Sequence, residues 1–389
     1  MWIIVFLVLL VVIHYTRFAV RPSYISPTIP GGRAFITNNA MDYRELMIMR
    51  AVRNIDITSA TICCGERFHR LLGLIEKRMN EKRDLTVRII IRRMFTDGKS
   101  IQILRRLHEE YPNFYYLILV DRLSVYPFGL IENHIKITVI DNYFIIGSSN
   151  IGGDDTYIAH FKDADLIGTG ENIIKEVETA FEVLWQLMGG RSISCGYKHI
   201  KINIPNIPEI ENLCITCDSM KLIVQFNPNE STITKELVHM IHRNKRIIIM
   251  TPAFSPSRML LKALEGKKHT IISNSYNSLD RPDKYSYSLI TVKNSLSTSN
   301  VLGYSFQEHN LHKKIWVFDN HCVIGSYNAT FKSHTIDYEC VIIVSGKEIT
   351  QHILDNIYAE KKFCSQIDLK INRLQLIMAT IMQFLTRFA

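Results

Sequence analysis

One six-residue pattern occurs twice in this chain, and the two copies constrain the fold more than any other feature. The first lies between Glu132 and Asn150 and the second between Glu308 and Asn328. Each reads H-x-K-x4-D followed by G-S-x-N, and each residue of the second copy lies 178 positions after its counterpart, as 312 − 134 and 328 − 150 show. The paired residues are His134, Lys136, Asp141, Gly147, Ser148 and Asn150, and His312, Lys314, Asp319, Gly325, Ser326 and Asn328. Such a duplication predicts two similar lobes that form one active site on a pseudo-twofold axis.

Each copy is centred on a predicted strand. ITVID and IWVFD are rich in β-branched and aromatic residues, and a Gly-Ser turn signal follows each of them. A His and a Lys two positions apart share one face of a strand, an arrangement that a purely structural strand does not require. Asp141 and Asp319 belong to the same motif set, but their odd spacing from the His places them on the opposite face. We expect these two acids to have a structural role.

The repeated residues match the needs of phosphodiester cleavage through a covalent enzyme. That reaction needs a nucleophile, a proton donor for the leaving alkoxide, and positive charge beside the non-bridging oxygens. Two histidines and two lysines supply all three, so the chemistry needs no metal or other cofactor. The expected phosphate-binding residues are Lys136, Lys314, Ser148, Asn150, Ser326 and Asn328.

The pattern resembles the phospholipase D superfamily in its two-motif, single-chain form, from about residue 40 to about residue 365. The stretches NIGGDDTYIAHFKDADLIGTG and GSYNATFKSHTIDYE, one after each motif, are similar to the cardiolipin synthase branch. Departures concern the substrate: Lys162 and Lys332 stand where that branch has Arg, and Ala329-Thr330-Phe331 replaces L-D-P. The resemblance implies a phosphohistidine intermediate, with His134 as the nucleophile and His312 as the general acid.

Two further acids are expected to orient the catalytic histidines. A carboxylate that accepts a hydrogen bond from an imidazole fixes its tautomer and stabilises its charged form. The resemblance places Glu339 on the final acid of the family, which makes it the candidate for one histidine. For the other histidine we select Asp165, with Asp163 as the alternative.

The rest of the chain predicts an α/β fold of two pseudo-symmetric sandwich lobes of the phospholipase D type, preceded by an N-terminal transmembrane helix. Strand and helix patterns alternate in both halves, as expected for α/β sandwiches. The expected units are a membrane anchor at 1–20, a linker at 21–39, lobe one at 40–190, an interlobe connection at 191–228, lobe two at 229–365 and a C-terminal amphipathic helix at 366–389.

The N-terminal run Trp2 to Ile13 is unbroken apolar sequence that could extend to the length of a membrane helix. No Lys or Arg precedes it, which disfavours a cleaved signal peptide. Basic residues follow it, at Arg17, Arg21 and Arg33, so the positive-inside rule predicts a single membrane anchor with a cytoplasmic catalytic body. The segment PSYISPTIPGG, rich in Pro and Gly, is expected to be a linker.

Charge and cysteine content leave several partners open. A net charge of +9 favours an anionic partner, either membrane phospholipid or nucleic acid. Cys214-x-x-Cys217 invites a zinc or redox interpretation, but no second C-x-x-C exists, so we expect no metal site. The main hypothesis is a membrane-anchored phosphatidyl transferase or phospholipase that forms a complete active site as a monomer. The alternatives are a nuclease of the same superfamily and a viral envelope or wrapping-membrane phospholipase-like protein.

Overall fold

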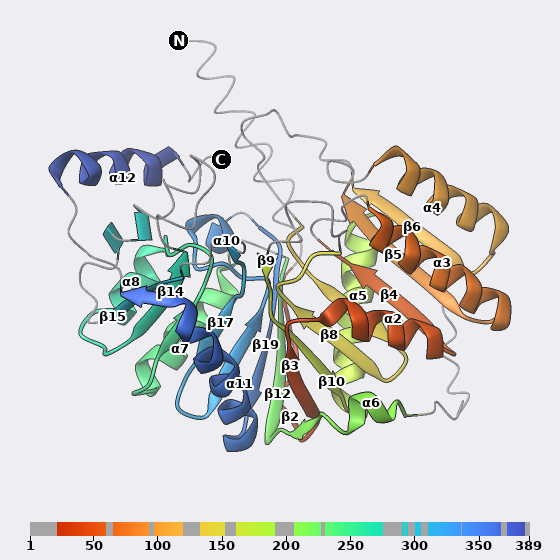
Figure 1. Ribbon diagram of the computed structural model, residues 1–389, viewed down its shortest axis with the longest axis horizontal. Helices are drawn as coiled ribbons and strands as arrows, with labels where there is room; N and C mark the ends of the chain where they lie inside the picture. Colours follow the sequence, from red (N-terminus) through yellow and green to blue (C-terminus); the bar gives the residue numbers. More distant parts are fainter. Residues whose placement is uncertain are drawn as a thin grey trace, which may run out of the picture.

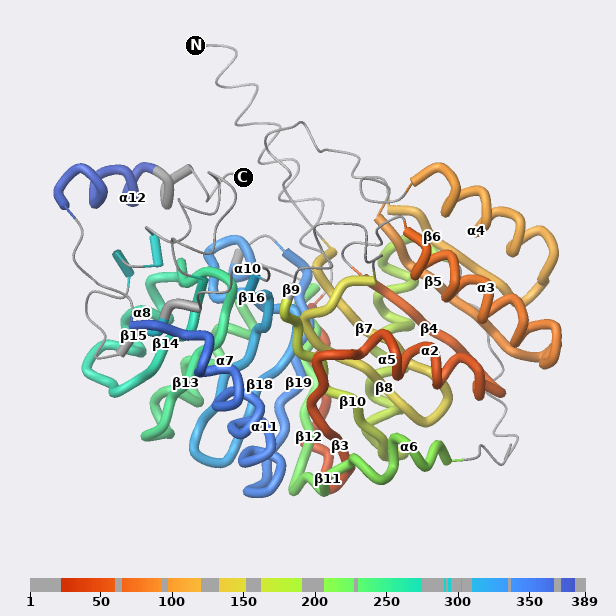
Figure 2. The backbone as a smooth tube through the Cα atoms, in the orientation of Figure 1, coloured from red at the N-terminus to blue at the C-terminus, as the bar shows by residue number. Residues whose placement is uncertain are grey.

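The computed structural model describes residues 22–59, 65–92, 97–119, 133–151, 161–190, 206–226, 230–274, 290–291, 293–294, 300–304, 310–335, 337–366 and 372–385. Two β-sheets form the centre of the molecule, and helices cover the outer side of each (Figure 1). The backbone tube shows the two halves meeting along the strands β3, β12 and β19 (Figure 2). The two lobes predicted by the repeat are therefore present.

The first lobe contains a mixed sheet in which the described strands run in the order β11-β3-β10-β8-β7-β4-β5-β6. Strands β4, β5 and β6 are parallel, whereas β7, β8, β10 and β3 pair antiparallel in succession. The strands are β3 (Arg33–Thr37), β4 (Asn54–Thr58), β5 (Thr86–Arg92), β6 (Phe114–Leu119), β7 (Ile137–Ile140), β8 (Tyr143–Gly147), β10 (Asp165–Thr169) and β11 (Ile215–Thr216). The helices of this half are α2 (Ala40–Arg50), α3 (Glu66–Glu81), α4 (Gly98–Glu110), α5 (Glu171–Leu187) and the short α6 (Pro208–Glu211).

The second lobe repeats this plan with the described strand order β1-β12-β19-β18-β17-β13-β14-β15-β20, and β2 also pairs with β12. The strands are β1 (Tyr24–Ile25), β2 (Ile29–Pro30), β12 (Ser219–Gln225), β13 (Ile248–Met250), β14 (Thr270–Asn274), β15 (Asn300–Tyr304), β17 (Ile315–Val317), β18 (His321–Gly325), β19 (Glu339–Ser345) and β20 (Cys364–Gln366). The helices are α7 (Thr232–Arg243), α8 (Arg258–Leu264), α10 (Phe331–Thr335), α11 (Lys347–Glu360), η5 (Lys361–Phe363) and α12 (Arg373–Leu385). A small parallel pair, β9 (Phe161–Lys162) with β16 (Asn310–Leu311), joins the two lobes.

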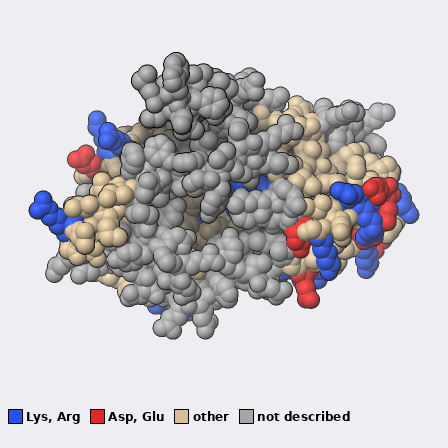
Figure 3. Space-filling model, turned by 90° about the horizontal axis from the view of Figure 1, so that it is seen from above, with Lys and Arg blue, Asp and Glu red and all other residues tan. Residues whose placement is uncertain are grey.

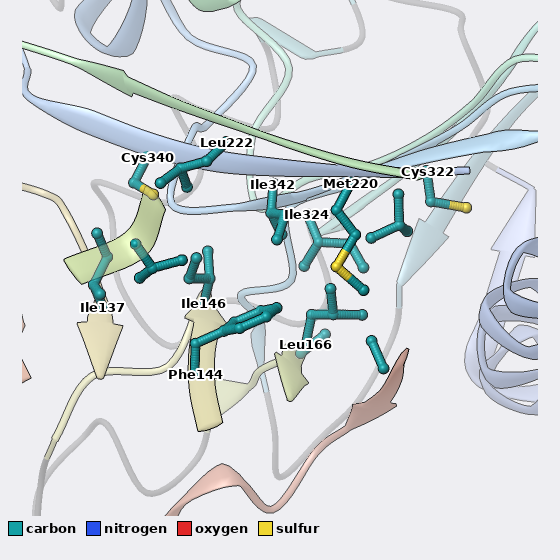
Figure 4. Close-up of a cluster of buried hydrophobic side chains, with 14 of the residues drawn as sticks. Ile137, Phe144, Ile146, Leu166, Met220, Leu222, Cys322, Ile324, Cys340 and Ile342 are labelled. Carbon is teal, nitrogen blue, oxygen red and sulfur yellow. The ribbon is translucent and has the colours of Figure 1, made fainter. Parts of the chain in front are cut away.

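Hydrophobic periodicity explains the layers. In α3 the apolar residues Phe68, Leu71, Leu72, Ile75 and Met79 follow helical spacing and are all buried. Such helices cover the outer faces of the sheets, and α5 and α11 contribute to a third cluster that lies between the lobes. Residues of both sheets meet in that shared cluster (Figure 4). The labelled residues are Ile137, Phe144, Ile146, Leu166, Met220, Leu222, Cys322, Ile324, Cys340 and Ile342.

The segment predicted as a linker forms three strands instead. β1 and β2 pair with β12 in the second lobe, and β3 lies between β10 and β11 in the first. Because β1 and β2 are two-residue edge strands, the prolines of this segment cost few ladder hydrogen bonds. β11 and β12 likewise fall within the predicted interlobe connection, so the second sheet includes residues before position 229.

Two predicted segments lie at the ends of the chain, a transmembrane anchor and an amphipathic helix. The predicted transmembrane anchor at 1–20 lies outside the described residues. Among the residues that are described, no helix combines the length and apolar character that crossing a membrane requires. At the C-terminus, α12 occupies part of the segment predicted as an amphipathic helix.

Candidate active site

The backbone of each motif histidine is fixed by the opposite lobe. His134 precedes β7 of the first lobe, and its backbone N–H donates to the Tyr338 carbonyl at 3.0 Å. His312 precedes β17 of the second lobe, and its N–H donates to the Lys162 carbonyl at 2.9 Å. The two hydrogen bonds are equivalent under the pseudo-symmetry, and each carbonyl belongs to the residue just before an acid.

The His134 ring lies against Glu339, as the sequence predicts. Its Nδ1 is 3.0 Å from Oε2 and 3.2 Å from Oε1 of that carboxyl. Glu339 is fully buried, whereas 14% of the His134 side chain is exposed. A donor contact on Nδ1 orients the ring so that its other nitrogen is available for chemistry.

His312 is paired with Asp163, and the selection of Asp165 was wrong. His312 Nδ1 lies 2.6 Å from Asp163 Oδ1. Asp165, two residues after Asp163, instead accepts the backbone N–H of Ser149 at 3.2 Å. The alternative named from the sequence is therefore the residue that orients the second histidine. As a result, each His–acid pair takes one residue from each lobe.

Strand register places the orienting acid at the same point of both lobes. Gly147 pairs with Asp165 across β8 and β10, and Gly325 pairs with Val341 across β18 and β19. The orienting acid comes two residues before the paired position in both lobes, at 163 and 339. The offset between these acids is 176 (339 − 163), which differs from the 178 of the motifs because the connection after the first motif is two residues longer.

The two motif serines hold the orienting acids. Ser148 Oγ donates to Asp163 Oδ1 at 2.7 Å and accepts the Ala164 N–H at 2.9 Å. Ser326 makes the equivalent pair of contacts, donating to Glu339 and accepting the Cys340 N–H at 2.9 Å. Each hydroxyl has only one proton to donate. These buried serines therefore support the orienting acids, and a direct contact of either with phosphate stays a prediction.

The motif glycines allow the acid-bearing strand to approach closely. A Cβ on Gly147 would lie 2.5 Å from the Ala164 carbonyl, and one on Gly325 would lie 2.7 Å from the Val341 Cα. No larger residue fits without separating the strands. In each motif the Gly thus allows the strands to approach closely, and the Ser that follows it supplies the hydroxyl that contacts the acid.

Both lysines lie on the same side of the chain as their histidine, as their spacing predicts. Lys136 Nζ donates to the His134 carbonyl at 3.0 Å, and Lys314 Nζ donates to the His312 carbonyl at 2.6 Å. Burial and then the charge of Lys136 lower the pKa of Lys314 to about 7. The influence of Lys136 also reaches His312 and Glu339, so the charged residues of the two motifs form one electrostatic site.

The two acids differ in charge state. Although burial acts to raise it, the neighbouring His312 and Lys314 hold the pKa of Asp163 well below its usual range. Burial raises the pKa of Glu339, against the opposing contact from Ser326. The first acid is thus an anion at neutral pH, whereas the second retains a proton more readily.

The His312 ring is held in its neutral form. Burial and then the charge of Lys314 lower the pKa of His312 to about 4, against the opposing effect of Asp163. A neutral imidazole whose Nδ1–H donates to a carboxylate presents a lone pair on Nε2. With 15% of the side chain exposed, the ring remains accessible to a substrate.

Asp141 and Asp319 lie away from the histidines and stabilise the start of a strand in each lobe. Asp141 accepts the N–H groups of Val52 and Arg53, both at 2.8 Å, just before β4. Asp319 accepts those of Lys245 and Arg246, both at 2.9 Å, before β13. The motif makes Asp141 and Asp319 candidates for the catalytic set, but these backbone contacts agree instead with the structural role expected from their odd spacing.

Other predicted residues lie near this site. Asn150 is half-buried, and its Oδ1 accepts a 3.5 Å hydrogen bond from Ser59. Asn328 is also half-buried at the equivalent position, and a phosphate-binding role for both amides stays a prediction.

Cys217 is buried and Cys214 half-buried, and no group of three or more His, Cys, Asp or Glu within the described ranges is placed to hold a metal ion.

Comparison with known protein families gives an independent match. Residues 223–359, most of the second lobe, match the family model described as cardiolipin synthase, PLD-like domain. The chain is 24% identical over 267 residues to a cardiolipin synthase of Clostridium perfringens strain 13, covering 66% of this chain and 55% of the relative. It is 25% identical over 250 residues to that of strain SM101, covering 61% of this chain and 51% of the relative. The chain thus spans about half the length of these relatives.

Solved structures show the same fold over a larger part of the chain. The crystal structure of a phosphatidylserine synthase from Haemophilus influenzae Rd KW20 is similar with a TM-score of 0.64 and 12% identity, and the match covers 96% of both chains. A polyphosphate kinase from Porphyromonas gingivalis is similar with a TM-score of 0.51 and 11% identity, covering 91% of this chain and 55% of the kinase. At these identities the similarity concerns the arrangement of the two lobes.

Proposed function

We propose that this chain, which is similar to the cardiolipin synthase branch of the phospholipase D superfamily, is a membrane-associated phosphodiesterase or phosphatidyl transferase acting on phospholipids. The observation that carries this proposal is the pair of His–acid contacts, His134 with Glu339 and His312 with Asp163, each formed across the two lobes. One chain thereby supplies a nucleophile, a proton donor and two lysines, so a monomer suffices.

The proposed reaction has two steps. In the first, a neutral imidazole nitrogen attacks phosphorus, the P–N bond forms, and the P–O bond to the leaving alcohol breaks as that oxygen takes a proton from the second histidine. In the second, an acceptor alcohol or water gives a proton to the second histidine and attacks phosphorus, and the P–N bond breaks. Lys136 and Lys314 would stabilise charge on the phosphate oxygens.

We assign the nucleophile to His312, which reverses the assignment expected from the family resemblance. Burial and the charge of Lys314 lower the pKa of His312, which favours the neutral imidazole that a nucleophile requires. The His134–Glu339 pair retains a proton more readily, because burial raises the pKa of that carboxyl. His134 is therefore the proposed general acid.

The direct test is turnover of labelled phosphatidylglycerol, followed as cardiolipin or phosphatidic acid. We expect one of these products with the parent chain and none with His312→Ala. The net charge of +9 also suits a nuclease, so cleavage of single-stranded DNA or RNA in EDTA is measured in parallel. Nucleic-acid cleavage that requires His312, without any lipid turnover, would replace the phospholipid with a polynucleotide as substrate.

A further inference from the structure

The start of the C-terminal helix α12 is stabilised by contacts between residues that are close in the sequence. Asn372 precedes it, and the side chain of Asn372 accepts the Gln375 N–H at 2.8 Å while the Gln375 side chain accepts the Asn372 N–H at 2.9 Å. This reciprocal pair is a capping box, which satisfies free N–H groups at a helix start. A 13-residue helix is nevertheless marginal in water without packing against a surface.

One face of α12 is apolar and exposed. Leu374, Ile377, Met378 and Ile381 follow the spacing i, i+3, i+4 and i+7, which places them on one side of the helix. Their exposed fractions are 67%, 48%, 42% and 53%, while Ala379 is fully buried. Four neighbouring large side chains are thus exposed to water, whereas apolar faces of helices normally pack against another element.

The charge around α12 matches an anionic surface. From Lys361 to the C-terminus the sequence contains five basic residues and one acid, a net charge of +4 (5 − 1). Between Leu374 and Thr386 it contains no charged residue, and Arg373 and Arg387 flank that run. Basic residues beside an apolar helix can extend to lipid head groups while their stems lie along the apolar region.

The length and position of α12 suit a helix lying on a membrane. Thirteen residues span about 20 Å, shorter than the roughly 30 Å of a bilayer core. The helix lies at the same end of the molecule as β9, β16 and α10, the elements next to the catalytic residues (Figures 1 and 2). Viewed from that end, the described acidic side chains gather mainly over the first-lobe helices on the right (Figure 3).

We propose that α12 is an interfacial helix whose exposed apolar face enters the head-group boundary of an anionic phospholipid bilayer and holds the catalytic end of the molecule at the membrane surface. The choice of lipid as the partner rests on the proposed function. Leu374, Ile377, Met378 and Ile381 would lie about 5–10 Å into the boundary region, with the helix axis parallel to the membrane.

The test compares tryptophan placed at two adjacent positions of the full chain. Ile381→Trp puts the reporter on the face of Leu374, Ile377 and Met378, and Thr380→Trp puts it about 100° away, on the side of Arg373 and the less exposed Leu376. Vesicles contain equal parts of phosphatidylglycerol and brominated phosphatidylcholine, which quenches indole in the boundary region. The parent chain, which already has Trp2, Trp185 and Trp316, gives the background to be subtracted.

We expect Ile381→Trp to lose most of its added fluorescence and Thr380→Trp to lose little. Equal quenching at both positions, or none at position 381, would overturn the proposal. A change at position 381 that follows protein concentration without vesicles would show that a second copy of the chain covers this face, and would also overturn it. Quenching needs no turnover, so this result stands apart from the catalytic proposal.

A second variant links α12 to activity. Ile377→Gln combined with Ile381→Gln removes apolar contacts that would hold the helix in the boundary, so turnover of phosphatidylglycerol in vesicles should fall about tenfold. Hydrolysis of soluble bis(p-nitrophenyl) phosphate should not change, because neither residue lies in the catalytic site. An equal loss on both substrates would contradict the membrane role, whereas a parent chain inactive on both would count against the proposed function alone.

Discussion

Replacing Asp163 with Asn tests the contact that orients His312. Asp163 Oδ1 accepts hydrogen bonds from the His312 ring at 2.6 Å and from Ser148 at 2.7 Å. The amide is nearly isosteric but carries no charge, and it can turn an N–H toward the ring. That contact favours the tautomer with the proton on Nε2, which removes the lone pair needed for attack on phosphorus.

The expected loss follows from the role of this contact. Removing an orienting partner of a functional histidine costs 10- to 100-fold in mild cases and about 10⁴-fold when the tautomer is reversed. Because Asp163 is buried and anionic, we expect a fall in kcat of about 10²- to 10⁴-fold, equivalent to about 3–5 kcal/mol of barrier. The assay is initial-rate turnover of labelled phosphatidylglycerol, with thermal unfolding to verify the fold.

Asp165→Asn is the matched control. This residue is nearby and also buried, but its side chain accepts the Ser149 backbone N–H at 3.2 Å. Burial and the charge of Asp163 raise the pKa of Asp165 to about 6, so removing its charge costs less than removing that of Asp163, whose pKa lies below its usual range. Activity should therefore stay within about threefold of the parent. Full activity in Asp163→Asn, with loss in Asp165→Asn at unchanged stability, would refute the pairing described here.

Three further results are expected. Labelled phosphoenzyme should be trapped in His134→Ala with a p-nitrophenyl substrate, whose leaving group needs no acid, and be absent in His312→Ala; the opposite pattern would restore the assignment implied by the resemblance. The pH profile of kcat/KM should rise through about 4, as His312 becomes neutral, and fall through about 7, as Lys314 loses its charge; a lower limb near 6.5 would contradict this. Lys313→Met should lower the free energy of unfolding in urea by about 3–5 kcal/mol, because it leaves Glu360 buried without the Nζ that lies 2.6 Å away, and adding Glu360→Gln should recover part of the loss.

The sequence predicted the repeated chemistry well because fixed spacing within a strand is local. His134 and Lys136 are two residues apart, so their common side follows from β geometry alone. The two-lobed α/β architecture and the contact of Glu339 with one of the two histidines also agree with expectation. Most long elements, such as α5 with its buried Ile, Val, Phe and Leu residues, carry a periodic signal that needs no tertiary information.

The remaining features depend on contacts between distant segments. The choice between Asp163 and Asp165 depends on which of the two carboxyl groups reaches His312 of the other lobe, and that contact joins residues 149 positions apart in the sequence. β1 and β2 are too short to show periodicity, and they exist because β12 offers them an edge. The roles of Ser148 and Ser326 follow from their burial beside the acids. The motif alone does not reveal that burial.

The central claim is that residues of both lobes form one phospholipid-cleaving site. The most direct measurement incubates the full chain with vesicles containing labelled phosphatidylglycerol and follows cardiolipin and phosphatidic acid, with His312→Ala and Asp163→Asn alongside. The account predicts one of these products from the parent chain, none from His312→Ala and a loss of at least about 10²-fold in Asp163→Asn. No lipid turnover by the parent chain under any detergent, vesicle or acceptor-alcohol condition, or turnover that persists in His312→Ala, would contradict it.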